Sequence, residues 1–219
     1  MKISWLTQPL RCAVLVCIAL SMVGCQSAYY NTMEKMGYAK RDILVDRVEE
    51  ATETQAEVKE QFQSAYQAFN ALLKLESSDL ENRYETLNDA YEDSQDKADE
   101  LEDRVAAIES VAEALFDEWN AELSEYKSAS LKSSSARKLK TTKSRYNNYL
   151  KSLKRAEAKV KPVLAVFKDQ VLFLKHNLNA EKVSALKGEV RRFDSDVKGL
   201  VKEMDRSISD AKRFVQGLE

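Results

Sequence analysis

The chain is poor in the two residues on which the turns of β-sheet proteins depend. Its 219 residues include five glycines and two prolines. A sheet protein of this size needs many more, because tight turns rely on glycine and proline. Alanine, glutamate, lysine, leucine and serine are abundant instead. The composition therefore argues against a β-sandwich or β-barrel and predicts an all-α fold built from long helices.

Histidine and cysteine are scarce as well, which limits the chemistry that the chain can perform. His176 is the single histidine, and the three cysteines are Cys12, Cys17 and Cys25. A zinc site or a nucleophile–base pair therefore has no candidate residues. The sequence also lacks a phosphate-binding glycine loop, a dinucleotide fingerprint and a Gly-x-Ser-x-Gly motif. We expect no enzymatic activity, metal site or cofactor, and we expect His176 to lie near a helix C-terminus, where a cation is mildly favoured.

One acidic stretch, EDSQDKADELED (92–103), has the carboxylates that a calcium site would need. It lacks the glycine and the regularly spaced aspartates of an EF-hand loop. We therefore predict a solvated or salt-bridged helix face at this position.

No apolar run in the sequence is long enough to cross a membrane. The longest, residues 13–20, follows Lys2 and Arg11 and precedes small and polar residues, whereas a spanning helix needs about 20 apolar residues. A charged lead followed by a short apolar block is the layout of a secretory signal. Residues 1–24 are therefore predicted to be a cleaved signal peptide, with an uncleaved membrane anchor as the alternative.

The end of this signal carries a cysteine in place of the small-residue site of an ordinary secreted protein. The stretch Met-Val-Gly-Cys (22–25) resembles a bacterial lipobox, in which a small residue precedes a cysteine that receives a diacylglyceride. The resemblance implies cleavage between Gly24 and Cys25, lipid attachment to Cys25, and a lipidated tether over residues 25–30. Gln26 is not the aspartate that favours inner-membrane retention in known lipoproteins. We therefore expect a lipid anchor in the outer membrane, with the rest of the chain facing the periplasm.

Apolar residues recur every three to four positions along the mature chain, as they do in helices that pack in bundles and coiled coils. This spacing predicts four helices, over about 31–75, 79–127, 131–177 and 180–217. The predicted core positions are Leu44, Val48, Ala51, Gln55, Val58, Phe62, Ala65, Phe69, Leu72, Leu80, Tyr84, Leu87, Tyr91, Ser94, Ala98, Leu101, Val105, Ile108, Ala112, Leu115, Trp119, Tyr126, Leu139, Tyr146, Tyr149, Leu153, Ala156, Val160, Val163, Phe167, Leu174, Val183, Leu186, Val190, Phe193, Val197, Leu200, Met204, Ala211 and Phe214.

Local signals mark the ends of these helices. A capping box at Ser78–Glu81 predicts a helix start, the serine-rich stretch 127–135 is predicted to hold a turn, and Asn179 is a candidate N-cap. Short connections make consecutive helices antiparallel. Residues 31–219 are therefore predicted to form an elongated antiparallel four-helix bundle or coiled coil.

Charge is divided between the second and third predicted helices. Residues 76–125 hold 18 acids and three bases, whereas residues 131–175 hold 13 bases and two acids. Opposite charge favours packing of these two helices side by side within one chain, with Glu109 and Lys151 at the same level if the turn lies midway between them. The alternative, a parallel homodimeric coiled coil through residues 80–126, would bring two acidic helices together. A monomer is therefore favoured.

The basic stretch ARKLKTTKSRYNNYLKSLKR (136–155) interleaves aromatic residues with lysine and arginine, a pattern also found in nucleic-acid binding. We expect most of its cations to pair with the acidic helix, and an outward-facing remainder could contact anionic lipid or lipopolysaccharide. A nucleic-acid partner is not expected, because an exported lipoprotein rarely meets nucleic acid.

The segment YYNTMEKMGYAKRDILVDRVEEA (29–51) resembles the opening of a domain-of-unknown-function family, numbered 2959, of Gram-negative coiled-coil lipoproteins. The resemblance extends over essentially the whole mature chain. It implies a helical lipoprotein of the envelope and implies no activity, cofactor or known site. Tyr29, Tyr30 and Tyr38 follow the predicted anchor closely, where they suit either a membrane interface or the lower core of the bundle.

Two functions agree with these features. The first is a lipid-anchored envelope protein of structural or interaction type, acting as a spacer or scaffold, with the membrane and an envelope protein as partners. The second is a periplasmic binding module that holds a lipid or other amphiphile between its helices, around Trp119, Tyr146 and Phe167.

Overall fold

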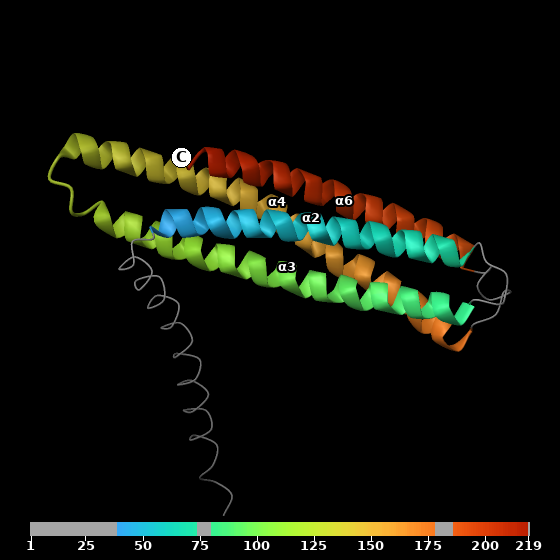
Figure 1. The fold of residues 1–219 in the computed structure, drawn as a ribbon. Helices are drawn as coiled ribbons and strands as arrows, with labels where there is room; N and C mark the ends of the chain where they lie inside the picture. Colours follow the sequence, from blue (N-terminus) through green and yellow to red (C-terminus); the bar gives the residue numbers. More distant parts are fainter. Residues whose placement is uncertain (1–38, 74–79, 178–185, 219) are drawn as a thin grey trace, which may run out of the picture.

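The computed structural model describes residues 39–73, 80–177 and 186–218 (Figure 1). Within these ranges the chain forms four α-helices and no strand: α2 (Lys40–Leu72), α3 (Leu80–Glu122), α4 (Ala129–His176) and α6 (Lys187–Gln216). The all-α prediction is confirmed. None of these helices is long and apolar enough to cross a membrane.

The four helices pack in a ring in which each helix contacts its neighbours in the sequence and α6 returns to contact α2 (Figure 1). Consecutive helices run in opposite directions, and all four lie roughly along one long axis. The predicted elongated antiparallel four-helix bundle is confirmed. We name the end that contains Lys40, Glu122 and Ala129 the proximal end, and the opposite end the distal end.

The core follows the predicted apolar spacing closely. An α-helix completes one turn in 3.6 residues, so apolar residues three or four positions apart lie on the same face. All nine predicted core residues of α2 and all nine of α4 are buried. In α3, the series from Leu80 to Leu115 is buried, whereas Tyr84, Tyr91, Ala98 and Trp119 are half-buried. The described predicted positions at Leu186 and in α6 are all buried.

The prediction that Tyr126 is a core residue is wrong. Tyr126 is 40% exposed, because α3 ends at Glu122 and Tyr126 lies in the connection that follows. Tyr126 continues the seven-residue spacing of α3. This spacing places a residue in the core only where the chain is still helical, and α3 ends before Tyr126.

Polar residues also occupy core positions. Gln55 and Ser94 are fully buried, and each donates a hydrogen bond to a carbonyl of its own helix, Gln55 Nε2 to Ala51 O at 3.2 Å and Ser94 Oγ to Ala90 O at 2.6 Å. Such local bonds satisfy the buried donors without a partner from another helix.

The predicted turn within residues 127–135 is misplaced by several residues. The connection between α3 and α4 covers residues 123–128, and the serines that follow it are helical. Ser128 is the N-cap, whose side chain accepts a hydrogen bond from the Leu131 backbone N–H at 3.4 Å. Serine has only a modest cost inside a helix, so one well-placed serine starts the helix and the remaining serines continue it.

The predicted level of Glu109 with Lys151 is also corrected. Glu109 pairs with Lys154, at 2.6 Å between Oε1 and Nζ. The aromatic contact between Phe116 and Tyr146, with ring centroids 5.3 Å apart, sets this register. Because core packing and not the midpoint of the turn fixes the register, the partner lies nearly one helical turn further along α4. The predicted pairing of the acidic helix with the basic helix is itself confirmed here.

The remaining boundaries are consistent with the prediction where the structure describes them. The predicted cap at Ser78, the candidate cap at Asn179, the core position Val183 and the predicted helix starts at residues 31 and 180 lie outside the described residues. Pro162 lies on the exposed face of α4, which continues as a helix on both sides of it.

Candidate functional site

The predicted lipid-attachment and cleavage residues, Cys25 and Gly24, lie outside the described residues, as do the signal 1–24 and the tether 25–30. The described chain begins at Ala39, immediately before α2, at the proximal end (Figure 1). The anchor therefore remains a prediction. The proximal end is the part of the bundle to which the predicted tether connects.

An ion pair between a buried lysine and a half-buried glutamate holds the start of α2 against the end of α3 at the proximal end. Lys40 is only 6% exposed, and its Nζ lies 3.0 Å from Glu118 Oε1. A buried lysine needs such a partner, because an unpaired charge in a low-dielectric interior is costly. The pair fixes the point at which the chain enters the bundle.

Four aromatic rings form a packed cluster near the same end. The Tyr146 ring lies edge-on to Phe116 at 5.3 Å between centroids and 5.9 Å from Phe214. Tyr149 stacks on Phe214, with ring centroids 5.6 Å apart and planes at 13°. Burial raises the pKa of the Tyr146 and Tyr149 hydroxyls above the usual range of tyrosine. Both hydroxyls therefore stay protonated to a more alkaline pH than an ordinary tyrosine does.

A groove with a volume of about 580 Å³ opens between α4 and the end of α6, beside this cluster. It is lined by Arg145, Asn148, Tyr149, Asp210, Arg213, Phe214, Gln216 and Gly217. Arg145 Nη1 donates to the Gly217 carbonyl at 3.3 Å. A Cβ at Gly217 would displace this guanidinium, which is the end of a flexible, exposed side chain.

The Tyr149 hydroxyl is the notable polar group of the groove wall. Its oxygen is buried and has no hydrogen-bond partner in the structure, although Tyr149 lines the groove. Arg213 pairs with Asp210, and Arg145 carries a positive charge that the Gly217 carbonyl does not neutralise. The groove thus combines an aromatic wall, a cation and an unused donor.

The first part of α4 is strongly basic and forms the outermost portion of the proximal end. Residues 127–145, here named the basic end, contain seven lysines and arginines and no acid. Figure 1 shows that α4 runs on past the end of α6, which is marked C. The basic end therefore has less of its surface covered by neighbouring helices than the rest of α4.

Ion pairs from α4 occur only beyond the basic end in the described structure, and there they involve three of seven lysines and arginines. Beyond the basic end, Lys154 pairs with Glu109, Lys161 with Glu102, and Arg155 with Glu203. Within the basic end, none of the seven cations has an ion-pair partner among the residues that the structure describes. The prediction that most cations of residues 136–155 pair with the acidic helix is therefore wrong. Among the described residues, Lys154 alone of these cations pairs with α3, and Arg155 pairs with Glu203 of α6.

The residues predicted to surround an amphiphile are separated in the structure. Trp119 Nε1 donates to Ser135 Oγ at 2.8 Å, and Tyr146 belongs to the proximal aromatic cluster. Phe167 instead packs against Tyr91 and Phe193, with centroids at 5.7 and 5.0 Å. None of the three lines the groove beside Tyr149.

His176 and the acidic stretch behave as predicted from the sequence. His176 is exposed in the last turn of α4. Within residues 92–103, Glu100 pairs with Lys97 and Arg104, and hydrogen bonds from these cations lower the pKa of its carboxyl. Several other acids of the stretch are exposed. Across the described ranges, no group of three or more histidine, cysteine, aspartate or glutamate side chains is arranged to hold a metal ion.

The sequence interpretation missed the groove and the uncovered tip of the bundle. Tyr149 and Phe214 were predicted as core residues, which they are, but their spacing says nothing about a space beside them. The exposed Leu131, at 59%, and Tyr126, at 40%, mark the tip. Leu131 falls outside the heptad positions of the core, which is the one signal in the sequence that points to it.

These features define a class of protein, an elongated antiparallel four-helix bundle with a packed core and a basic, partly uncovered end. The chain belongs to the family described as "Protein of unknown function (DUF2959)", whose model matches residues 29–218. The predicted family is thereby confirmed, and the lipoprotein and Gram-negative aspects of the resemblance stay predictions. No curated protein and no solved structure significantly matches the chain.

Proposed function

We propose that the protein is a lipid-anchored component of a Gram-negative cell envelope that acts as a spacer or scaffold and has no catalytic activity. In this proposal Cys25 carries the lipid, the anchor lies in the outer membrane, and the bundle stands in the periplasm. The observation that carries the proposal is the lipobox-like stretch 22–25 placed directly behind a short apolar run. The bundle begins 15 residues after Cys25, at Lys40.

The shape of the bundle supports a spacing or scaffolding role. The longest helix, α4, has 48 residues, and at 1.5 Å per residue it is about 72 Å long. A single continuous core extends through all four helices, from Ile43 to Leu218. A bundle packed in this way resists bending, so it keeps a partner at a fixed distance from the anchor. Its long exposed faces offer area for an envelope protein.

Metabolic labelling with palmitate tests the anchor. The wild-type protein is expected to incorporate the label and to fractionate with membranes, and Cys25→Ser is expected to lose the label. Cys17→Ser is the matched control, because Cys17 lies in the segment predicted to be removed, and it should label as the wild type does. Equal labelling of the Cys25→Ser variant would overturn the lipid anchor.

Density fractionation tests the choice of membrane. The labelled wild type is expected in the outer-membrane fraction. The Gln26→Asp variant is expected to move toward the inner membrane, as the resemblance to known lipoproteins implies. Wild-type protein found wholly in the inner membrane would contradict the proposed location while leaving the anchor intact.

Crosslinking in cells tests the scaffold role. A reproducible envelope protein should be recovered with the wild type, and recovery should fall for the unanchored Cys25→Ser variant, which is no longer held beside its partner. Recovery of no envelope protein under conditions that capture known envelope complexes would count against a scaffold.

A second candidate is a binding module for an anionic amphiphile, and the groove beside Tyr149 favours it. An acidic headgroup placed there would meet Arg145 and would lie beside the buried Tyr149 hydroxyl, which has no partner in the structure. An acyl chain would lie along the groove wall to which Tyr149 and Phe214 contribute. Native mass spectrometry of protein extracted from membranes should detect a bound lipid. Arg145→Gln should lose the lipid and Arg137→Gln, a control at an exposed arginine outside the groove, should retain it; a wild type without lipid would dismiss this candidate.

A further inference from the structure

We propose that the basic end of α4, residues 127–145, docks on the phosphate-bearing headgroups of the membrane in which the chain is anchored. This proposal rests on the lipid anchor proposed above and adds a second, electrostatic contact with the same membrane. The bundle would then stand on its proximal end and would not swing freely on its tether.

The charge of the basic end is available to a partner. Lys127, Lys132, Lys138 and Lys140 are exposed, and within the described part of the chain none of them forms an ion pair. Arg137 Nη1 donates a hydrogen bond to the neutral Ser133 Oγ, at 2.7 Å. Since the other contacts of this segment are also to uncharged groups, the positive charge is not neutralised inside the molecule.

Two of these other contacts position cations without neutralising them. Lys143 Nζ lies 5.4 Å from the centre of the Phe116 ring, and Arg145 binds the Gly217 carbonyl. Both interactions leave the full positive charge at the surface. They also hold the base of the segment against α3 and α6, so the cations beyond it project from a fixed helix.

The exposed acids nearest to the basic end in the sequence come from the last turns of α3 and from the connection that follows it. Glu113, Asp117, Glu122 and Glu125 are exposed, and none of them forms an ion pair with the basic end. They are fewer than the seven cations, so this end of α4 keeps an excess of positive charge.

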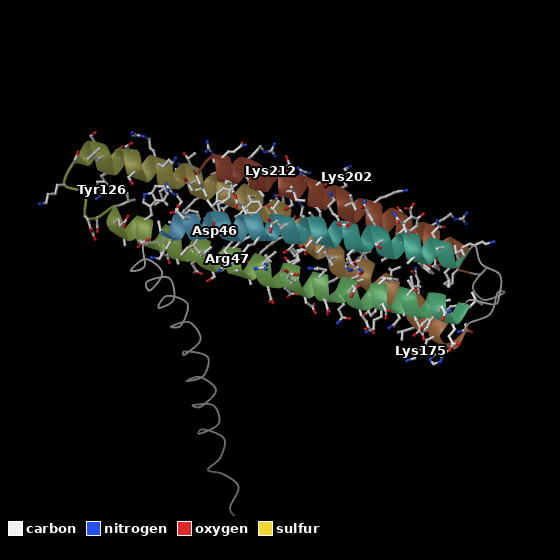
Figure 2. All side chains as sticks on the ribbon, in the orientation of Figure 1. Asp46, Arg47, Tyr126, Lys175, Lys202 and Lys212 are labelled. Carbon is white, nitrogen blue, oxygen red and sulfur yellow. The ribbon has the colours of Figure 1, made fainter. Side chains whose placement is uncertain are left out.

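Two exposed apolar side chains lie among the cations at the tip. Tyr126 is 40% exposed and Leu131 is 59% exposed, and Lys127 and Lys132 follow them directly in the sequence. Figure 2 shows Tyr126 at the extremity of the bundle. A tyrosine or a leucine flanked by lysines suits the boundary between headgroups and acyl chains. The apolar part of each side chain leaves water there, while the lysines stay among the headgroups.

The position of the tip agrees with a membrane as the partner. The start of α2 lies at the same end of the bundle, and Ala39 is the fourteenth residue after Cys25. Such a segment spans at most about 50 Å when fully extended, so the anchor keeps the basic end within reach of its own membrane. An anionic surface attracts nearby lysines and arginines additively. A soluble acidic protein would also satisfy the charge, but it would not explain why the apolar tip and the cations share the anchored end.

The test uses the mature chain 25–219 carrying Cys25→Ser, so that no lipid contributes to binding. This chain retains every described core residue, from Ile43 to Leu218, and therefore keeps the bundle. Its binding to vesicles of phosphatidylcholine is compared with binding to vesicles containing about 30% phosphatidylglycerol, by co-sedimentation. We expect binding to the anionic vesicles alone, and we expect it to be abolished by high salt because the contact is electrostatic.

Matched charge reversals locate the contact. The variant Lys132→Glu/Lys138→Glu/Lys140→Glu should bind anionic vesicles at least about 100-fold more weakly, since the loss of each lysine alone costs roughly five-fold in affinity and the introduced glutamates add repulsion. The control Lys175→Glu/Lys187→Glu/Lys202→Glu changes net charge equally at exposed residues far from the tip (Figure 2 labels Lys175 and Lys202), and it should bind within a few-fold of the parent. Equal loss in both variants would mean that only net charge matters and would overturn the proposal.

A fluorescent label reports which end meets the lipid. Leu131→Cys and Leu172→Cys place it at two exposed leucines at opposite ends of α4, 59% and 49% exposed. With anionic vesicles, the label at position 131 should shift to the blue and be quenched by brominated lipid, and the label at 172 should do neither. A shift at 172 and none at 131 would overturn the proposal, and so would absence of binding to anionic vesicles.

The outcome is independent of the anchor experiment. Loss of palmitate label in Cys25→Ser supports the lipid anchor whether or not the vesicles bind. Failure of the unlipidated chain to bind anionic vesicles removes the headgroup contact and leaves the lipid anchor as it stands.

Discussion

The basic end of α4 and the section that follows it differ in ion pairing: three of the seven lysines and arginines in the later section are paired, and none in the basic end is, among the residues that the structure describes. In the later section, Lys154 and Lys161 lie 2.6 and 2.7 Å from glutamates of α3. In the basic end, Lys132 and its neighbours have no such partner within the described chain, although α3 is rich in acids. The difference teaches that opposite net charges on consecutive helices neutralise each other only where core packing brings the side chains to the same level.

Burial differs between the two sections in the same way. The later section carries fully buried residues such as Leu153 and Phe167, which α3 and α6 cover. At the start of the basic end, residues 129–134 are all exposed. The later section of α4 therefore contributes to the core of the bundle, whereas the tip is exposed to solvent.

The largest expected effect on stability is the difference between a carboxylate placed in the buried core and one placed at the exposed tip. Leu101→Asp should destabilise the bundle by several kcal/mol, because Leu101 is fully buried and an unpaired buried carboxylate is costly. That loss is comparable with the whole stability of a typical domain, about 5–15 kcal/mol. Leu131→Asp, at an exposed residue, should change stability by less than about 0.5 kcal/mol. Urea unfolding followed by circular dichroism measures the stability of both variants. Similar unfolding midpoints would contradict the distinction between a buried core and an exposed tip.

Alkaline pH should lower the stability of the bundle through Tyr146 and Tyr149, which follow the basic end directly along α4. Burial raises the pKa of Tyr146 and Tyr149 in the folded state, so above about pH 10 the unfolded chain releases protons that the folded chain keeps. Stability from these tyrosines is fully present below the pKa of an unfolded tyrosine and is lost as pH rises above it, by up to about 1.4 kcal/mol per pH unit for each tyrosine.

Thermal melting between pH 9 and pH 11 provides the measurement, with conditions chosen to bracket the ordinary tyrosine pKa of about 10. The variant Tyr146→Phe/Tyr149→Phe is the control, because it retains every lysine and arginine that titrates in the same range. Its stability should fall less steeply than that of the wild type. Parallel profiles would show that the two hydroxyls are not held protonated by the fold.

A smaller effect is expected from the unpartnered hydroxyl itself. Tyr149→Phe removes a buried oxygen that has no hydrogen bond, and relieving such a group should stabilise the bundle by about 1 kcal/mol. Tyr126→Phe, at a 40% exposed residue of the tip, should leave stability unchanged. Equilibrium unfolding at neutral pH compares the two, and destabilisation by Tyr149→Phe would mean that the hydroxyl is bonded in solution.

The smallest effect concerns the ion pairs themselves. A double-mutant cycle on Glu109 and Lys154 should give a coupling energy of about 0.5 kcal/mol, since both side chains are partly exposed. The same cycle on Glu122 and Lys138, which form no ion pair in the structure, should give none. Added salt should weaken the first coupling. Equal couplings in the two cycles would remove the distinction between paired and unpaired cations.

Cysteines at positions 109 and 154 test the same register by geometry. In a Cys25→Ser mature chain, a short reagent should crosslink them within one molecule, which gel mobility under denaturing conditions reports. Exclusively intermolecular crosslinks would mean that α4 pairs with another copy, and a dimer would replace the monomeric bundle.

The helices and their inward faces were predictable because the pattern is local. The spacing from Leu44 to Leu72 assigns a buried stripe without knowledge of any partner, and all nine positions are buried. The end of a helix was less predictable: Tyr126 continued the spacing of α3 beyond Glu122. The turn was misplaced because a serine-rich stretch has weak preferences, and a single cap at Ser128 decides where the helix begins.

The groove and the basic end could not be predicted from the same patterns. Tyr149 reads as a core residue in the sequence, and only the end of α6 at Gln216 beside it leaves a groove. Lys132 and Lys154 are equivalent in sequence terms, both lysines of one basic helix. Their roles diverge because Lys154 pairs with Glu109 of α3, whereas Lys132 has no ion-pair partner in the part of the chain that the structure describes.

The sequence alone determined the helical class, the four apolar stripes and the contrast between an acidic and a basic helix, because each depends on residue types at spacings of a few positions. The tertiary structure decided the register that pairs Glu109 with Lys154, the space beside Tyr149, and the cations left without a partner. Those features depend on where neighbouring helices end and how their rings pack, and such contacts join residues far apart in the chain.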